Sequence, residues 1–451
     1  MAGEPTTHTD EIEARLAAMT PEDFRRGMEI FRSKLRESEV DYLKSCVRCG
    51  LCAESCHYFL SDGEADSIPA SKLDVVASAF QRHFTIAGRI APGLSGARRF
   101  DRALARRWVD AVFGRCSLCG RCSLQCTMGI HIPSVLRAAR GTLTELGLIP
   151  SDLLATVQAS LDKGNNMGIE RQDWIETIEW LEEELQTATG DPNARIPIDR
   201  HGARYLFTVN PREPKFFPLT LLASATVLHA AKEDWTVASE GWDLTNYGLF
   251  SGSAAQGGPI SAQMLASMDR LGCGTLLMGE CGHGFAAARW EAPEWLQRTP
   301  AFPIRSFLEV MEEYLRDGRI RVDPSRNPEP VTLHDPCNLV RHGGVFEPQR
   351  EILRRSVARF VEMTPNRAEN YCCGGGGGQL SMGRYKERRL RAGGIKAEQI
   401  RRTGAKIVVA PCHNCIDQLM ELNKEYELGV SIQTVAEVVS NALVFESPVA
   451  G

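Results

Sequence analysis

Clustered cysteines dominate the chemistry that this chain can perform. Two runs share the spacing C-x2-C-x2-C-x3-C: Cys46, Cys49, Cys52 and Cys56, and then Cys116, Cys119, Cys122 and Cys126. A third group has five members: Cys337, Cys372, Cys373, Cys412 and Cys415. Runs with this spacing typically bind iron–sulfur clusters. The chain is therefore predicted to be an iron–sulfur protein that transfers electrons.

The spacing also predicts which cysteines share a cluster. Three cysteines at i, i+3 and i+6 can surround one cubane [4Fe–4S] cluster, while the fourth cysteine reaches the other cluster. One predicted set is Cys46, Cys49, Cys52 and Cys126. The other set is Cys116, Cys119, Cys122 and Cys56. Zinc is the alternative, but zinc sites favour separated CxxC pairs or mixed cysteine and histidine ligands.

The third group exceeds the needs of a cubane. Four thiolates suffice for a cubane, so five indicate a larger cluster or one with an exchangeable position. The glycines of 374–378 suit a backbone that passes close to a bulky inorganic core. A phosphate-binding loop is disfavoured, because the segment lacks both the Gly-Lys-Ser/Thr ending and the GxGxxG spacing.

Composition limits the setting. A chain of 451 residues has room for two or three domains, and a net charge of −5 gives no indication of nucleic-acid binding. The polar, acidic N-terminus does not resemble a secretory signal. The apolar stretch 218–231 is too short to span a bilayer and predicts a buried helix. These observations predict a cytoplasmic protein, because clustered cysteines bind metal in the cytoplasm, where thiols stay reduced.

The order of elements predicts an α plus α/β fold. A helical extension (1–40), a helical domain with both four-cysteine runs (41–147) and a helical linker (148–200) come first. Short β-rich runs follow, alternating with helices: 205–209, 275–278, 331–334 and 406–409. This alternation predicts largely parallel sheets. The predicted lobes are 201–300 and 301–445.

The two lobes look like an internal repeat. The first two β-rich runs align with the last two, and Cys281 aligns with Cys412. Gly248 and Leu249 stand where the second lobe has its paired cysteines. The first lobe is therefore predicted to be a degenerate copy.

Arginines crowd the segment between the two cysteine runs. Residues 82–121 contain nine arginines but only Asp101 and Asp110 as acids. Phe100, Leu104 and Trp108 fall on one face of a predicted helix. One interpretation is an ordinary amphipathic helix that covers the clusters. The other is a docking surface for a membrane subunit or for anionic headgroups.

These motifs resemble a known family. The helical ferredoxin followed by His334-Asp-Pro-Cys337, Cys372-Cys373-Gly374 and Cys412-x2-Cys415 is similar to heterodisulfide reductase D. Its degenerate first lobe, with Gly279-Glu-Cys-Gly-His283, most resembles DsrK-like (also TmcB- and HmeD-like) subunits of membrane complexes. The resemblance implies two Rossmann-like α/β CCG lobes. It also implies that the third cysteine group binds a non-cubane [4Fe–4S] cluster active in disulfide chemistry.

Three residues beside this group are candidates for catalysis. His413 lies between two implied ligands, and His283 follows Cys281 in the aligned position. Disulfide reduction needs protons, which a histidine can deliver; the alternative is a hydrogen bond to backbone or cluster sulfur. Cys281 is expected either to face the cluster or substrate sulfur, or to be an inert buried thiol. Cys273 is expected to be structural.

The predicted function is that of a subunit on the inner face of the cytoplasmic membrane. Its expected partners are a cytochrome b-type subunit that interacts with quinone and other iron–sulfur or electron-carrier subunits. The expected substrate is a disulfide or trisulfide of a small thiol or sulfur-carrier protein. The alternative is an iron–sulfur relay for a flavin dehydrogenase, such as glycolate oxidase or anaerobic glycerol-3-phosphate dehydrogenase. A non-catalytic scaffold or metal sensor is a third possibility.

Overall fold

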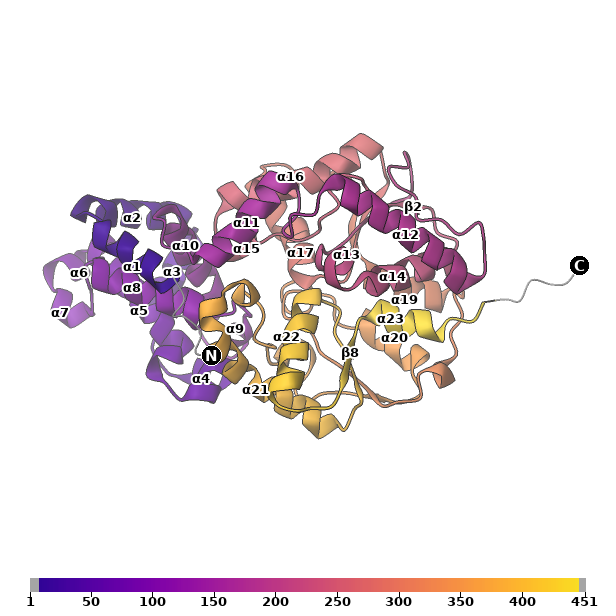
Figure 1. The fold of residues 1–451 in the computed structure, drawn as a ribbon. Coiled ribbons are helices and arrows are strands. Elements are labelled where there is room, and N and C mark those ends of the chain that lie inside the picture. Colours follow the sequence, from indigo (N-terminus) through magenta and orange to yellow (C-terminus); the bar gives the residue numbers. More distant parts are fainter. Residues whose placement is uncertain (1–7, 446–451) are drawn as a thin grey trace, which may run out of the picture. The chain divides into compact units, whose positions relative to one another are not determined.

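The computed structural model describes residues 8–445, which form two compact units. The first unit is helical and contains the chain up to Val157 together with two later segments, Tyr247–Ala255 and Tyr371–Lys396. The second unit contains the remainder. Figure 1 traces the chain through both units, and the later segments of the helical unit are salmon and orange in its colouring. Each of these later segments begins at the tyrosine of an Asn-Tyr pair.

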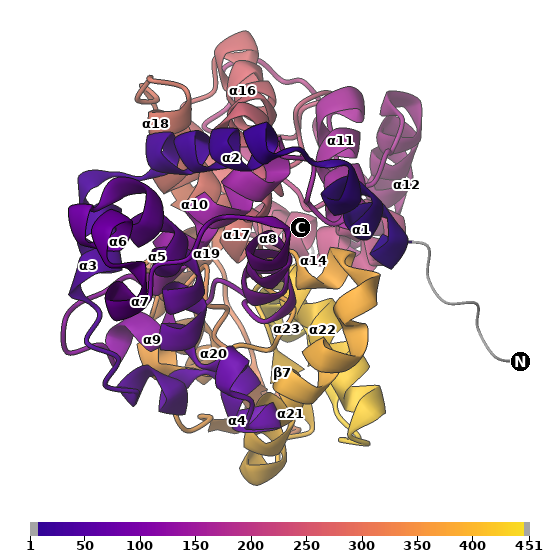
Figure 2. The ribbon, with the colours of Figure 1, turned by 90° about the vertical axis from the view of Figure 1, so that its left-hand side faces the viewer.

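Helices of the first unit begin at recognisable caps. Thr20 caps α2 by accepting a hydrogen bond from the backbone N–H of Asp23, whose carboxylate accepts from the backbone N–H of Thr20 at 2.8 Å. Pro21 occupies the first turn, where its missing N–H costs no hydrogen bond. The α-helices that lie wholly in this unit are α1 (His8–Ala18), α2 (Pro21–Lys34), α3 (Glu37–Ser45), α4 (His57–Asp62), α5 (Pro69–Phe84), α6 (Ile86–Ile90), α7 (Pro92–Ser95), α8 (Arg102–Val109), α9 (Arg121–Leu124), α10 (Ile132–Glu145) and α15 (Gly248–Ser251). Figure 2 shows α10 beside α2.

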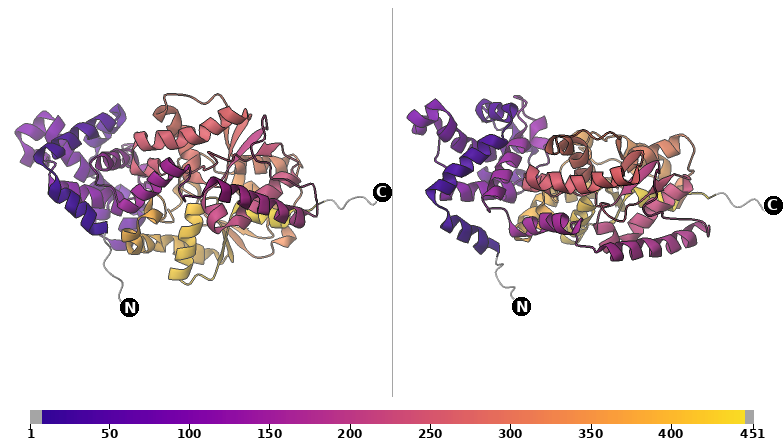
Figure 3. Two further views of the ribbon diagram at one scale, coloured as in Figure 1. Left: turned by 45° about the horizontal axis from the view of Figure 1, so that its top comes forward. Right: turned by 90° about the horizontal axis from the view of Figure 1, so that it is seen from above.

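Short helical turns complete the first unit. They are η1 (Leu51–Ser55), η2 (Ala65–Ser67), η3 (Asp110–Gly114), η7 (Gln379–Ser381) and η8 (Gly383–Tyr385). Three longer helices, α11 (Ser151–Lys163), α16 (Ala254–Leu271) and α21 (Lys386–Thr403), contain residues of both units. Both views of Figure 3 show the indigo and purple helices as one bundle.

Helix α8 is amphipathic, as predicted. Leu104 and Trp108 are buried, and Phe100 just before the helix is buried too. Two arginines of its exposed face hold α1. Arg102 donates to the carbonyl of Leu16 at 2.9 Å, and Arg106 forms an ion pair with Glu13 on α1.

The second unit contains two four-stranded parallel sheets with the same topology. The first sheet has the order β2-β1-β3-β4, and the second has the order β6-β5-β7-β8. The strands are β1 (Tyr205–Thr208), β2 (Trp235–Thr236), β3 (Thr275–Met278), β4 (Ile304–Ser306), β5 (Val331–Leu333), β6 (Phe360–Val361), β7 (Ile407–Val409) and β8 (Ser431–Gln433). Equivalent central pairs are in register, with Leu206 opposite Leu276 and Thr332 opposite Val408. The predicted α plus α/β fold with two similar lobes is confirmed.

Both lobes of the second unit contribute residues to one hydrophobic core. The helices that lie wholly in the second unit are α12 (Arg171–Thr189), α13 (Arg212–Phe216), α14 (Pro218–Ala230), α17 (Gly282–Ala286), α18 (Ala292–Trp295), α19 (Phe307–Arg316), α20 (Pro348–Ser356), α22 (His413–Glu425) and α23 (Val435–Ala442), with turns η4 (Ala287–Glu291), η5 (Pro324–Arg326) and η6 (Arg367–Glu369). Helix α12, which was predicted as part of a linker, buries Trp174 and Leu181 in this core. Within residues 8–445, no helix has both the length and the apolar composition needed to cross a bilayer.

Candidate functional site

The two cysteine runs fold into the same backbone turn. Left-handed angles recur at the same two places, at Arg48 (φ 55°) and Gly50 (φ 84°) in the first run and at Leu118 (φ 54°) and Gly120 (φ 77°) in the second. Glycine adopts such angles without a Cβ clash. In the second run, the N–H of Leu118 points at the Cys116 sulfur at 3.3 Å. Equal spacing has thus produced equal loops.

A cavity lies between the second run and the end of the first. Cys116, Cys119 and Cys122 line it together with Cys56. These four thiols are the set that the spacing predicts for one cubane, and four sulfurs around one cavity suit a [4Fe–4S] cluster. Ligation by these sulfurs stays a prediction.

The first run is more open to solvent. Cys49 is exposed, whereas Cys52 is buried. Burial raises the pKa of the Cys52 thiol, and the nearby sulfurs of Cys46 and Cys49 raise it further. Cys126, the predicted fourth ligand of this set, is half-buried at the end of the second run.

A buried lysine lies against the cavity of the second run. Lys72 on α5 is 2% exposed. Its Nζ donates to the carbonyl of Arg115 at 2.5 Å and lies 3.5 Å from the sulfur of Cys56. This ammonium group therefore places a positive charge beside a predicted ligand. Nothing in the sequence predicted this contact, because a single lysine within a mostly apolar helix carries no information about its neighbours.

One cysteine of the third group lies in the helical unit beside the second run. The hydroxyl of Ser117 is 3.5 Å from the sulfur of Cys372. The thiols of Cys372 and Cys119 are hydrogen-bonded, and this contact and burial together raise the pKa of Cys119. Arg121 also stacks on the ring of Tyr371, with its guanidinium carbon 3.8 Å from the ring centroid.

Gly377 explains part of the glycine run. Its φ is +65°, and a Cβ there would lie 2.6 Å from the carbonyl carbon and oxygen of Ser117. The close neighbour is therefore protein backbone. Gln379 continues this contact by donating to the carbonyls of Phe113 and Cys116. The segment after Cys373 is thus packed tightly on the second cysteine run.

This packing gives a first prediction. Gly377→Ala is expected to destabilise the helical unit by about 3 kcal/mol, because it adds a backbone clash to an unfavourable left-handed φ. Gly63→Ala is the matched control, since Gly63 has φ +67° with nothing within 4 Å of its Cβ position. The control should lose about 1 kcal/mol. Anaerobic denaturant unfolding would measure both variants, and equal losses would contradict the clash.

Arg140 joins four segments of the helical unit and is fully buried. The guanidinium donates to the carbonyls of Val112, Cys116, Phe250 and Gly377, at distances between 2.6 and 2.9 Å. Burial lowers the pKa of Arg140 to about 10, so it stays charged at neutral pH. The cysteine loop, the glycine run and the repeat-equivalent segment of the first lobe thus share one side chain.

In the second unit, the repeat places Cys281 and Cys412 in equivalent positions. Each cysteine follows a central strand, precedes a helix and donates its N–H two residues back, at 2.7 Å in both lobes. Their thiols are hydrogen-bonded. Hydrogen bonds from Cys281, from Cys415 and from His283 lower the pKa of Cys412, and His283 Nδ1 lies 3.2 Å from the sulfur of Cys281. Cys281 and His283 therefore lie beside an implied ligand.

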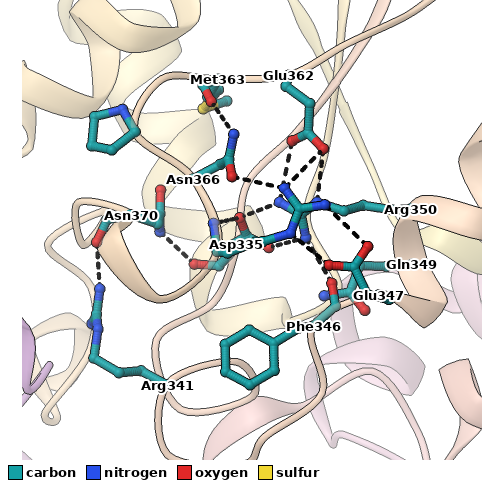
Figure 4. Close-up of polar contacts among 12 residues, drawn as sticks. Asp335, Arg341, Phe346, Glu347, Gln349, Arg350, Glu362, Met363, Asn366 and Asn370 are labelled. Atoms are coloured by element: carbon teal, nitrogen blue, oxygen red, sulfur yellow. Dashed lines mark hydrogen bonds and ion pairs between the residues drawn. The ribbon is translucent and has the colours of Figure 1, made fainter.

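Cys337 lies at the same edge of the second sheet as Cys412. It follows β5, which pairs with β7 in parallel. Its loop is held by a buried ion pair, in which Arg350 Nη2 lies 2.6 Å from the carboxylate of Asp335 (Figure 4). Asn370 donates to the carbonyl of Asp335 at 2.6 Å. The network therefore fixes both Cys337 and the residue that precedes Tyr371.

His413 does not point at the thiols. Its Nε2 lies 3.5 Å from Glu213 Oε1 and 3.5 Å from the Thr220 hydroxyl. Burial lowers the pKa of His413, but the carboxylates of Glu213, Glu280 and Asp417 together raise it more, so the net shift is upward. Glu213 was not predicted as a site residue. Its only distinguishing feature in the sequence is its position just after an Asn-Pro turn. Neighbouring Glu280 accepts from two N–H groups of α23, and burial raises its pKa to about 8.

The five cysteines of the third group are divided between the units. Cys337, Cys412 and Cys415 belong to the second unit, whereas Cys372 and Cys373 belong to the helical unit. Cys273, the predicted structural thiol, is buried in the hydrophobic core of the second unit.

Comparisons with known proteins agree with these motifs. A family model described as a 4Fe-4S dicluster domain matches residues 42–130, and one described as a cysteine-rich domain matches residues 331–420. The chain is 29% identical to an Hdr-like menaquinol oxidoreductase iron-sulfur subunit of Archaeoglobus profundus, over 89% of this chain and 80% of the relative. It is 23% identical to the D-type polypeptide of the dihydromethanophenazine:CoB--CoM heterodisulfide reductase of Methanosarcina acetivorans, over 89% and 94%. An EtfAB:quinone oxidoreductase of Syntrophomonas wolfei is 21% identical, over 89% and 58%.

Proposed function

Since the chain is a heterodisulfide reductase D-like iron–sulfur protein, we propose that it is the electron-transferring and catalytic subunit of a membrane-associated complex. It would pass electrons between a quinone-linked cytochrome b-type partner and the disulfide or trisulfide of a small thiol or sulfur-carrier protein. The observation that carries this proposal is the contact of Cys372 with Ser117 and Cys119. This contact would give electrons a short route from the second cysteine run to Cys372, a member of the third group that lies in the same unit.

The proposed cofactors are two cubane [4Fe–4S] clusters and one non-cubane [4Fe–4S] cluster. Cys46, Cys49, Cys52 and Cys126 would hold the first cubane, and Cys116, Cys119, Cys122 and Cys56 the second. Cys337, Cys372, Cys373, Cys412 and Cys415 would hold the non-cubane cluster, a proposal that rests on the cysteine pattern and the similarity. A bound cluster would supply single electrons and iron sites for sulfur.

The chain itself would supply the protons that disulfide reduction needs. Reduction of one disulfide consumes two electrons and two protons and gives two thiols. His283 lies within hydrogen-bond distance of the Cys281 sulfur and is therefore the better-placed proton donor. His413, which contacts Glu213, would act as a more distant proton reserve. Cys281 would face the cluster or the substrate sulfur.

A relay for a flavin dehydrogenase is the second candidate. The similarity to an EtfAB:quinone oxidoreductase favours it, because that relative is named for electron transfer to quinone without any disulfide. In that case, no thiol-dependent signal would arise from the third group, and a flavoprotein would co-purify.

Iron content and electron paramagnetic resonance test the proposal. The anaerobic protein should contain about 12 irons and develop a paramagnetic signal when it receives a thiol and an oxidant. The double variant Cys372→Ser/Cys373→Ser should lose about 4 irons together with that signal. Cys273→Ser is the control and should keep both. About 8 irons in the wild type, with signals of ferredoxin type only, would favour the relay.

A further inference from the structure

Helices α6 and α7 expose three large aliphatic side chains. Ile86 is 78% exposed, Ile90 is 79% exposed and Leu94 is 95% exposed. Figure 1 shows α6 and α7 at the edge of the helical bundle, beyond α5. Scattered apolar residues are normal at a surface, but three large aliphatic side chains within nine residues at this exposure are unusual. We call this set the α6–α7 patch.

The segment that carries the patch has only positive charges. Residues 75–100 contain Arg82, Arg89, Arg98 and Arg99 and no aspartate or glutamate. Arg89, Arg98 and Arg99 are exposed. His83 adds no charge at neutral pH, because burial and the surrounding arginines lower its pKa. Exposed aliphatic side chains among arginines complement an interface that is apolar inside and anionic at its surface.

The patch also lies beside the first cysteine run. Gly96, which ends α7, has its Cβ position 3.9 Å from the guanidinium of Arg48. Arg48 lies between Cys46 and Cys49, and Cys49 is exposed. Anything that binds the α6–α7 patch would therefore lie close to the first predicted cluster.

We propose that the α6–α7 patch inserts into the interface of an anionic lipid bilayer. Ile86, Ile90 and Leu94 enter the headgroup and acyl boundary, and the arginines of residues 82–99 bind phosphate groups of the lipids. This step deepens the membrane association of the proposed function and rests on it. It adds a lipid contact by the chain itself to any contact with a membrane subunit.

Flotation with vesicles tests the proposal on the full-length, iron-replete protein. Wild type should float with vesicles of phosphatidylglycerol and phosphatidylcholine but not with phosphatidylcholine alone, and binding should weaken as salt screens the arginines. Ile86→Ser/Ile90→Ser/Leu94→Ser should lower binding about tenfold. Arg98→Gln/Arg99→Gln should lower it about tenfold and flatten its salt dependence. The control Arg25→Gln/Arg26→Gln, on exposed α2 positions, should leave binding unchanged.

Two results would overturn the lipid proposal. One is wild type that binds no vesicle at low salt. The other is unchanged binding in both patch variants. The arginine variant keeps the test decisive if the triple variant folds poorly, because it leaves the apolar residues in place. Iron content, measured on the same samples, reports the cluster proposal separately, so failure of one proposal is not mistaken for failure of the other.

Discussion

Arg140→Met should unfold the helical unit at markedly lower denaturant than wild type. The substitution leaves the buried carbonyls of Val112, Cys116, Phe250 and Gly377 without this donor. Each unsatisfied buried acceptor costs on the order of 1 kcal/mol, so we expect a loss of about 4 kcal/mol. The second run should also lose iron, because the carbonyl of Cys116 is no longer held.

Two matched variants separate the causes of that loss. Arg26→Met removes an exposed arginine from α2 and should change the free energy of unfolding by less than about 0.5 kcal/mol. Arg140→Lys keeps the charge but cannot reach four carbonyls with a planar fork, so it should recover little stability. Full recovery by lysine would show that the charge matters and that the hydrogen bonds do not. Anaerobic unfolding followed by circular dichroism, with iron counted before each experiment, makes the comparison.

Much of the architecture could be predicted from local pattern. The four central strands, β1, β3, β5 and β7, are runs of aliphatic, aromatic and β-branched residues, and all four were predicted from the sequence. The four edge strands were missed: β2 and β6 are only two residues long, and the three residues of β4 and of β8 form no apolar run. The repeat itself was visible because Cys281 and Cys412 follow equivalent strands.

The membership of the two units could not be predicted. Segments Tyr247–Ala255 and Tyr371–Lys396 belong to the helical unit although they lie far along the chain. Nothing in their composition reports this, since their packing depends on partners more than 100 residues away. Only the structure gives the reason for two residues: Gly377 lies against the backbone of Ser117, and Arg140 is a fully buried charge in α10.

Site residues with metal-ligand spacing were predictable, whereas the groups that tune them were not. The spacing alone predicted that Cys56 would lie with the second run, and the structure places it on the same cavity. Lys72 and Glu213 went unnoticed, because a single charged residue has no characteristic spacing. His413 was singled out for its place between two cysteines, but its side chain points to Glu213 instead.

Lys72→Met should lower the reduction potential of the cluster proposed for Cys116, Cys119, Cys122 and Cys56. The Lys72 ammonium lies 3.5 Å from the sulfur of Cys56 and stabilises the more negative, reduced cluster. A unit charge about 5 Å away at an effective dielectric constant of about 20 contributes roughly 3 kcal/mol. For one electron, that energy corresponds to a shift in reduction potential on the order of 100 mV.

The first cluster and two variants provide the controls for this shift. In a redox titration followed by electron paramagnetic resonance, the cluster proposed for Cys46, Cys49, Cys52 and Cys126 should move much less in Lys72→Met. Lys72→Arg should stay close to wild type because it keeps the charge, and Lys424→Met, an exposed position, should match wild type. A lower potential in only the second cluster would slow electron delivery toward Cys372. An unchanged potential would mean that the lysine holds the carbonyl of Arg115 in place and does not tune the cluster.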